Sequence, residues 1–176
     1  MKKTTVSIII GSDSDLEIVQ HTCDTLKNFD VKFDLKILSA HRSPELLINY
    51  MKKIEKNGIK VIIVAAGYSA HLPGVIASYT ILPVIGVPLD SSSLKGLDSL
   101  LSIVQMPSGI PVLTTTIGKA GAINAALAAV EILSINDKSL KTKLNKFRTD
   151  QSKKIKDKNI LLEKIGYNKY IAKKNK

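Results

Sequence analysis

The heptapeptide KVIIVAA at residues 60–66 decides the fold of this chain. It is nearly all apolar and rich in β-branched side chains, which is typical of a strand buried on both faces of a parallel sheet. Gly58 ends the helix predicted before it, and Gly67 begins a loop after it. Such a strand needs a layer of helices on each side of the sheet, because both of its faces must be shielded from water.

Strand and helix patterns alternate on either side of this stretch. β-Branched or alternating runs predict the strands, and apolar residues at helical spacing predict the helices. We expect strands at Thr5–Ile10, Lys32–Leu38, Lys60–Ala66, Pro83–Val87 and Pro111–Thr115, and helices at Leu16–Phe29, Pro44–Asn57, Leu72–Tyr79, Leu97–Gln105, Ala120–Ser134 and Asp137–Lys156. The alternation predicts an α/β fold: a three-layer, flavodoxin-like open parallel sheet with a basic helix at its C-terminal end.

The positive charge of the chain is concentrated near its C-terminus. The 176 residues carry a formal net charge of +11, but residues 137–176 hold 14 Lys and Arg against 4 Asp and Glu, which leaves residues 1–136 at +1. A basic segment can meet anionic polymers, but a solvated lysine-rich helix with a frayed end is the better explanation of the pattern. With no Trp and 5% aromatic residues, we expect no nucleic-acid partner.

The length and composition predict one domain in a reducing compartment. We expect residues 1–158 to form a single α/β domain that includes the C-terminal helix, and residues 159–176 to form a Lys-rich extension. One cysteine, Cys23, cannot form an internal disulfide or a zinc cluster. The longest apolar run, Val61–Ala66, is far shorter than the roughly 18–20 residues that cross a bilayer. We therefore expect a soluble cytoplasmic protein with no membrane partner.

Three loops that follow predicted strands carry most of the polar chemistry. They are Gly11–Asp15 (GSDSD), Ser39–Pro44 (SAHRSP) and Gly67–Gly74 (GYSAHLPG). Ligands of open α/β sheets bind at the carboxyl ends of the strands, where these loops meet. Each loop also has a purely structural interpretation, since Ser and Asp cap helices well and His71 or Ser69 can do the same.

The side chains of these loops suit an anionic substrate and proton transfer. A glycine turn with hydroxyls at a helix N-terminus can bind an anion, and Arg42 can hold a phosphate with two N–H groups. His41, just before a predicted helix N-terminus, can exchange a proton with a substrate. No carboxylate or cysteine accompanies His41 and His71 at ligand spacing, so we expect no metal site.

Together, several motifs resemble those of one enzyme family. GSDSD, SAHRSP and the AHLPG of residues 70–74, with PVIGVP at 83–88, GLDSL at 96–100, SIVQMP at 102–107 and GIPV at 109–112, are similar to motifs of the PurE family. This family contains the 5-(carboxyamino)imidazole ribonucleotide mutases of purine biosynthesis. The resemblance runs in order from about Val6 to about Arg148.

The resemblance implies a reaction, an assembly and a set of site residues. Family members are homo-octamers without metal or organic cofactor, and they move a carboxyl group from the exocyclic nitrogen of an aminoimidazole ribonucleotide to ring carbon 4 through trapped CO2. By match, His41 is the general acid and base. The implied substrate-binding residues are Ser12, Ser39 and Arg42 for the 5′-phosphate, Asp15 for the ribose, and Gly67, Ala70, His71 and Leu72 for the wall over the imidazole and carboxylate.

The chain departs from the family pattern at three places. Tyr68 stands where a small residue is usual, Ser108 stands where Arg is common, and the Lys-rich end after Arg148 has no clear counterpart. Two other functions remain as alternatives. One is direct carboxylation of aminoimidazole ribonucleotide by CO2, although enzymes of that type usually lack the segment His71–Gly74. The other is a non-enzymatic nucleotide-binding module.

Overall fold

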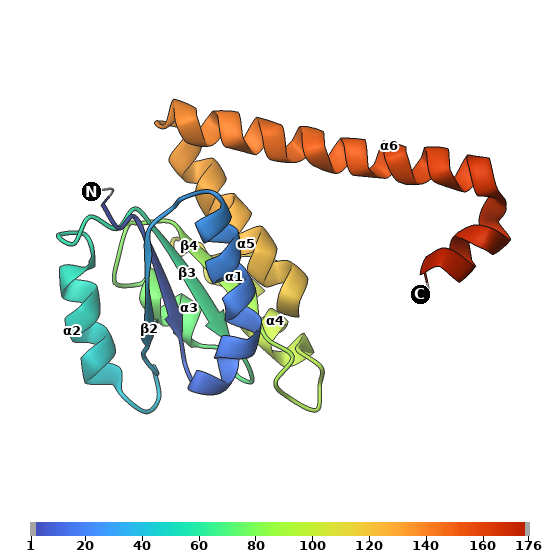
Figure 1. Ribbon diagram of the computed structural model, residues 1–176. Coiled ribbons are helices and arrows are strands. Elements are labelled where there is room, and N and C mark those ends of the chain that lie inside the picture. The colour runs from blue at the N-terminus through green and yellow to red at the C-terminus, as the bar shows by residue number, and fades with distance from the viewer. Residues whose placement is uncertain (1–2, 175–176) are drawn as a thin grey trace.

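Five parallel strands form one sheet in the computed structural model, which describes residues 3–174 (Figure 1). Their order across the sheet is β2-β1-β3-β4-β5. The strands are β1 (Val6–Ile10), β2 (Phe33–Ile37), β3 (Val61–Ala66), β4 (Val84–Pro88) and β5 (Leu113–Thr114). This order, with helices on both faces, confirms the predicted flavodoxin-like open sheet.

The helices divide between the two faces of the sheet. They are a short 3₁₀ turn η1 (Asp13–Asp15), α1 (Leu16–Asn28), α2 (Pro44–Ile54), α3 (Leu72–Ala77), α4 (Leu97–Val104), α5 (Gly118–Ser134) and α6 (Lys138–Lys174). One core cluster joins the sheet to α1, α5 and the start of α6, and the other joins it to α2, α3 and α4. The three predicted layers are therefore present.

The neighbouring strands β1 and β3 are buried on both faces. Every residue of each strand is buried, and the two strands pair in register from Val6↔Val61 to Ile10↔Ala65. Alternate side chains enter opposite clusters, so Ile63 packs toward α1 and α5 while Ile62 packs toward α2 and α3. The stretch KVIIVAA thus lies where its composition predicts.

Several elements differ in length from the sequence prediction. Strand β5 has two residues rather than the five predicted at Pro111–Thr115, since it lies at the sheet edge and Pro111 has no N–H to pair. Helix α2 ends at Ile54 rather than Asn57. Helix α6 does not end at Lys156 but continues to Gly166, because good helix formers follow and no breaker occurs before that residue. Gly166 has non-helical backbone angles, and a second helical stretch follows it to Lys174.

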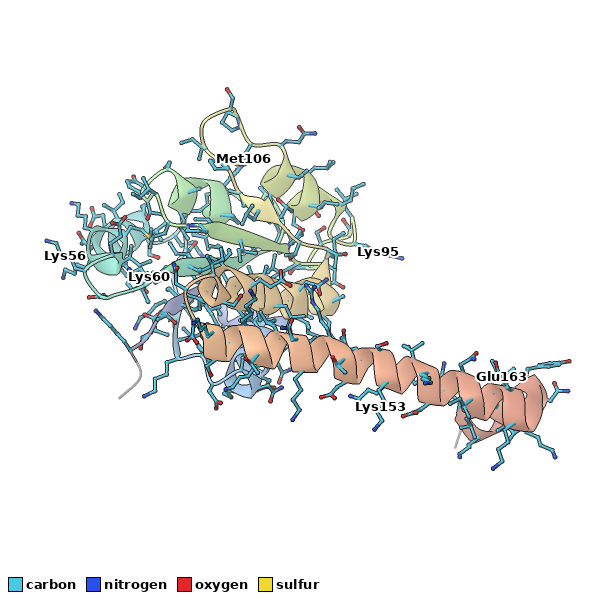
Figure 2. The ribbon with its side chains drawn as sticks, turned by 90° about the horizontal axis from the view of Figure 1, so that it is seen from above. Lys56, Lys60, Lys95, Met106, Lys153 and Glu163 are labelled. Carbon is cyan, nitrogen blue, oxygen red and sulfur yellow. The ribbon has the colours of Figure 1, made fainter. Side chains whose placement is uncertain are left out.

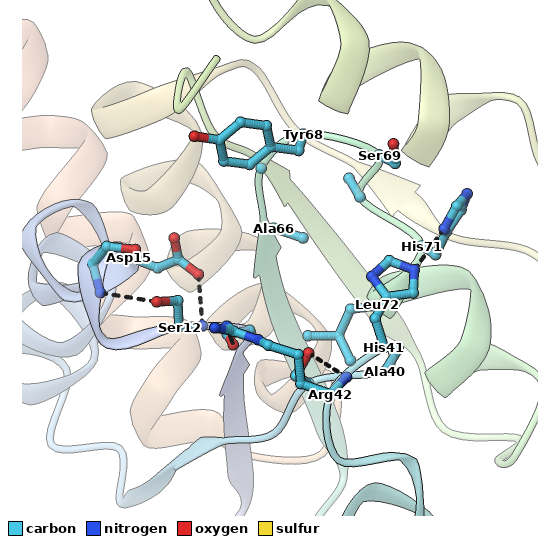
Figure 3. A pocket seen from close by; sticks show the side chains of 15 residues that line it. Ser12, Asp15, Ala40, His41, Arg42, Ala66, Tyr68, Ser69, His71 and Leu72 are labelled. Carbon is cyan, nitrogen blue, oxygen red and sulfur yellow. Dashed lines mark hydrogen bonds between the residues drawn. The ribbon is translucent and has the colours of Figure 1, made fainter.

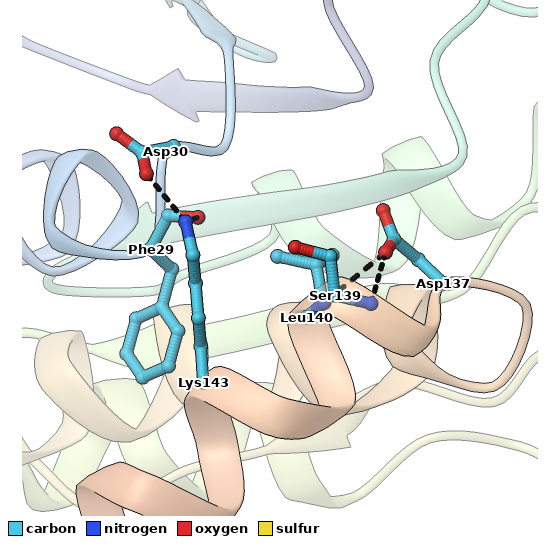
Figure 4. Close-up of polar contacts among 6 residues, drawn as sticks. All are labelled: Phe29, Asp30, Asp137, Ser139, Leu140 and Lys143. Carbon is cyan, nitrogen blue, oxygen red and sulfur yellow. Dashed lines mark hydrogen bonds and ion pairs between the residues drawn. The ribbon is translucent and has the colours of Figure 1, made fainter.

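The start of α6 is fastened to the domain by side-chain contacts. The carboxylate of Asp137 accepts hydrogen bonds from the backbone N–H groups of Ser139 (2.9 Å) and Leu140 (3.1 Å), which caps the helix. Lys143 reaches the carboxylate of Asp30 and the carbonyl oxygen of Phe29 (Figure 4). Lys143 thereby ties the start of α6 to the end of α1, and the buried side chains of Leu140 and Leu144 pack in the cluster shared with α1 and α5.

The rest of α6 projects away from the sheet (Figures 1 and 2). Residues 148–160 are all exposed, and the helix passes Lys158 without interruption. Its direction changes at Gly166, whose φ of 74° is left-handed. Asn175 and Lys176, the end of the predicted extension, lie outside the described residues. No helix within residues 3–174 has the length and apolar content needed to span a membrane.

Gly121 on α5 offers a test of this packing. A Cβ atom placed there would lie 1.6 Å from the carbonyl oxygen of Thr116, a backbone atom that cannot swing aside. We expect Gly121→Ala to lower the free energy of unfolding by about 3 kcal/mol, at the upper end of typical overpacking costs. Urea denaturation at fixed protein concentration measures this.

The matched control is Gly109→Ala, where nothing lies within 4 Å and only the left-handed φ of 97° is unfavourable. Its expected cost is about 1 kcal/mol. Equal losses in the two variants would contradict the close approach at Gly121.

Candidate active site

A pocket of about 490 Å³ lies at the carboxyl edge of the sheet. The three polar loops line it together, with residues from 11–15, 39–42 and 66–72 (Figure 3). All nine residues that the sequence singled out lie in its wall: Ser12, Asp15, Ser39, His41, Arg42, Gly67, Ala70, His71 and Leu72. The structure thus brings them together, whereas their individual roles remain predictions.

The loop after β1 places a buried carboxylate in the pocket. Ser12 caps the turn η1, and the carboxylate of Asp15 accepts a hydrogen bond of 3.1 Å from the backbone N–H of Ser12. Asp15 is only 9% exposed. Burial raises the pKa of Asp15 above its ordinary value, although hydrogen bonds from Ser12, Gly11 and Ser14 and the charge of Arg42 oppose the shift. The predicted cap and the predicted site therefore use the same residues.

The loop after β2 is tied to the loop after β1 by Arg42. One guanidinium N–H of Arg42 donates to the carbonyl oxygen of Gly11 at 2.7 Å, and its backbone N–H donates to the hydroxyl of Ser39 at 3.1 Å. A guanidinium has five N–H donors, so others remain for an anion in the pocket. Arg42 is exposed, so its charge is available to a ligand.

Ser43 does not cap the helix that it precedes. It lies before α2, whose first turn contains Pro44, but its hydroxyl makes no capping hydrogen bond to that helix. Instead the hydroxyl accepts from the backbone N–H of Ser39 at 3.1 Å and donates to the carbonyl oxygen of Ser39 at 3.2 Å. Ser43 therefore closes the turn that presents His41 and Arg42.

Two histidines meet at the other end of the pocket. Nε2 of His41 lies 2.9 Å from Nδ1 of His71, and the rings are nearly perpendicular at 86°. His71 is at the N-terminus of α3, but its side chain makes no capping hydrogen bond. In this hydrogen bond one ring donates the shared hydrogen and the other accepts it. The pair is arranged to hold and pass a proton.

Some residues outside the predicted site set also shape this pocket. Tyr68, which the sequence marks as a departure from the family pattern, and Ser69 line it directly. Ser91, from the loop after β4, lies against Gly67: a Cβ atom on Gly67 would lie 2.6 Å from the Ser91 hydroxyl oxygen, so a side chain there would displace Ser91. The sequence feature that could have identified Ser91 is its position in the loop after a fully buried strand, β4. Within residues 3–174, no group of three or more His, Cys, Asp or Glu side chains is placed to hold a metal ion.

Comparisons with known proteins agree with this geometry. A family model described as AIR carboxylase matches residues 5–154. The chain belongs to this family. It is 51% identical over 171 residues to the N5-carboxyaminoimidazole ribonucleotide mutase of Pyrococcus horikoshii, covering 97% of this chain and 96% of that protein. The mutase of Bacillus subtilis is 54% identical over 143 residues, which cover 81% of this chain and 88% of that one.

A solved structure has the same fold. The crystal structure of Treponema denticola PurE matches with a TM-score of 0.83 at 28% identity, over 94% of this chain and 100% of the other.

The segment after Arg148 differs among these comparisons. The family model ends at residue 154, whereas the match to the Pyrococcus protein covers 97% of this chain, so most of the segment has a counterpart in that relative.

The buried carboxyl of Asp15 predicts a pH dependence of stability. Because its pKa is raised in the folded chain, the native state binds this proton more tightly than the unfolded state does. The Asp15 contribution is therefore most favourable below the ordinary value of 3.8 and is lost as pH rises through the raised pKa. Relative to Asp15→Asn, we expect the wild-type free energy of unfolding to fall over this window. Urea denaturation of both proteins from pH 3.5 to 7 measures the two free energies of unfolding. A wild-type value that rises with pH relative to that of Asp15→Asn would contradict the expectation.

Proposed function

We propose that this protein isomerises N5-carboxyaminoimidazole ribonucleotide to 4-carboxy-5-aminoimidazole ribonucleotide in purine biosynthesis. The observation that carries the proposal is the contact between His41 and His71, at 2.9 Å, in a pocket whose opposite side holds Arg42 and Asp15. The pocket thus offers proton transfer at one end and anion binding at the other. Relatives about half identical to this chain are named for the same mutase reaction.

The arrangement of the pocket supports an orientation for the substrate. The hydroxyls of Ser12 and Ser39 and the guanidinium of Arg42 bind the 5′-phosphate, and the carboxylate of Asp15 faces the ribose. The backbone of Gly67 and Ala70, with the side chains of His71 and Leu72, forms the wall over the imidazole and its carboxylate. In this orientation the ring of the substrate lies beside His41.

The reaction needs one group that gives and takes a proton. The bond between the exocyclic nitrogen and the carboxylate breaks, CO2 leaves, and the nitrogen receives a proton from His41. Ring carbon 4 then attacks the CO2 held in the pocket, and its proton returns to His41. The two steps leave the enzyme unchanged, and no oxidant or reductant is consumed. The hydrogen bond to His71 orients the His41 ring during both transfers.

Direct carboxylation of aminoimidazole ribonucleotide is not favoured. The segment His71–Gly74, which enzymes of that type usually lack, begins α3 here and supplies the partner of His41. A simple assay separates the two reactions: the mutase forms product from the N-carboxylated substrate without added bicarbonate. A non-enzymatic binding module would form none under either condition.

We further propose that the chain acts in the cytoplasm as a homo-octamer, with residues 159–176 as an extension of a domain spanning residues 1–158. Exposed apolar side chains support an assembly. On α4, Leu97, Leu101 and Val104 are each about half exposed. On the projecting part of α6, Ile155, Ile160, Tyr167 and Ile171 are more than half exposed. Contacts between copies would remove this apolar surface from water.

His41→Asn is expected to abolish turnover while leaving binding intact. The asparagine cannot exchange a proton, so kcat should fall by at least about 100-fold, the usual contribution of a general acid or base. Ultraviolet detection of isomerisation measures the rate, and calorimetry with the product measures binding. The matched control is His21→Asn on α1, which lies outside the pocket and should keep its activity. A His41→Asn rate within about threefold of the wild type would show that His41 is not the proton-transfer group.

Arg42→Lys is expected to weaken binding more than catalysis. Lysine keeps the charge but loses the two-pronged donor, and phosphate contacts change little between ground and transition states. We expect KM to rise about tenfold, with a smaller change in kcat. The control is Arg148→Lys. The guanidinium of Arg148 pairs with the carboxylate of Glu131 at 2.6 Å, and neither residue lines the active-site pocket. An unchanged KM in Arg42→Lys and Arg42→Ala would remove Arg42 from the phosphate site.

A further inference from the structure

Tyr68 has an unfavourable backbone conformation. It is the second residue of the turn Gly67–Ala70, closed by a hydrogen bond of 3.2 Å from the backbone N–H of Ala70 to the carbonyl oxygen of Gly67. Its φ is +52°, in the left-handed region that bulky side chains seldom adopt. Glycine would fit this position without strain. Tyrosine at this position therefore destabilises the folded chain relative to glycine.

The side chain of Tyr68 recovers little of that cost within the chain. It is 63% exposed, and its hydroxyl has no hydrogen-bond partner among residues 3–174. Yet the residue lines the active-site pocket. In Figure 3 its ring lies on the side of the pocket where Asp15 is found, away from His41 and His71. An exposed aromatic ring that lines a pocket and is held in a strained backbone conformation is placed to contact a ligand there.

We propose that Tyr68 retains the substrate by closing its ring over the sugar of the bound ribonucleotide. This inference rests on the proposed function. Asp15 and Ser12 bound the sugar–phosphate half of the pocket on one side, and the Tyr68 ring is the large apolar group available to shield that half from solvent. Shielding strengthens the polar contacts of Asp15 and Arg42 with the sugar and phosphate, because water no longer competes for them.

The proposal assigns the effect to the ring and not to the hydroxyl. The ring lies apart from the two histidines, so it touches neither the departing nitrogen nor carbon 4. Tyr68 therefore acts on substrate retention, which appears in KM and in the dissociation constant, and not on kcat. It also contributes equally to any ligand that contains the ribose 5-phosphate unit, whether or not an imidazole is attached.

Three variants and two ligands test this. Tyr68→Gly removes the ring and relieves the strained φ, Tyr68→Phe keeps the ring, and Lys95→Gly relieves a similar φ of +50° at an exposed residue that does not line the pocket. The ligands are 4-carboxy-5-aminoimidazole ribonucleotide and ribose 5-phosphate. Steady-state kinetics, calorimetry with both ligands and thermal denaturation are measured at one protein concentration, and light scattering reports the assembly.

In Tyr68→Gly we expect KM to rise about tenfold, with kcat within about twofold of the wild type and a higher melting temperature. Its affinity for both ligands should fall by the same factor. Tyr68→Phe should match the wild type in every measurement, and Lys95→Gly should gain stability without a change in KM.

Three results would overturn the proposal. An unchanged KM in Tyr68→Gly would make the residue a bystander. A loss of affinity for the ribonucleotide but not for ribose 5-phosphate would place the ring over the imidazole instead. A change of assembly in Tyr68→Gly would make it a contact between copies. Failure of the proposed function is distinct, because the wild-type chain itself would then show no isomerisation, while the ribose 5-phosphate measurement still tests the ring.

Discussion

Strands β1 and β3 can be buried on both faces only if helices cover the sheet from two sides. Each connection from one parallel strand to the next must then cross over a face and return, so every strand ends at the same edge. The register from Val6↔Val61 to Ile10↔Ala65 brings the ends of β1 and β3 level there. The loops that carry Ser12 and Asp15, and Tyr68 and His71, consequently begin side by side. The position of the pocket follows from the burial of two apolar strands.

The pocket is organised before a ligand arrives. Arg42 binds the carbonyl oxygen of Gly11, Ser43 closes the turn at Ser39, and His41 is held by His71. Each loop is thereby fixed to a neighbour, so little ordering is left for substrate binding to accomplish. Asp15, in contrast, is left incompletely solvated by the protein, and this burial raises its pKa. Its carboxylate is therefore stabilised when a sugar hydroxyl donates a hydrogen bond to it. Rigid loops and one incompletely solvated acceptor together favour a polar ligand.

The sequence predicts the strands well, and it predicts that the polar loops meet at one edge of the sheet, where the pocket lies, because both depend on local pattern. The composition of KVIIVAA indicates an interior strand, and loops after such strands meet at one edge. The contact between His41 and His71 was beyond such patterns, since the residues are 30 positions apart and their ring orientation depends on packing. The burial of Asp15 was equally invisible, because in sequence it is one of two acidic residues in a cap. Helix α6 was underestimated because a solvated lysine-rich helix has no apolar stripe to mark its end.

The exposed part of α6 has a consequence for how the molecule exchanges its amide hydrogens. From Lys138 to Gly166 the helix extends for about 40 Å at 1.5 Å per residue, and residues 148–160 have solvent on every side. Backbone N–H groups there are protected only by hydrogen bonds within the helix itself, which open by local fraying and not by global unfolding. In an isolated chain these amides exchange with deuterium long before those of β1 and β3. Slow exchange along the same turns would mean that another surface covers them, so the deuterium uptake of this one helix records, turn by turn, which part of it is covered.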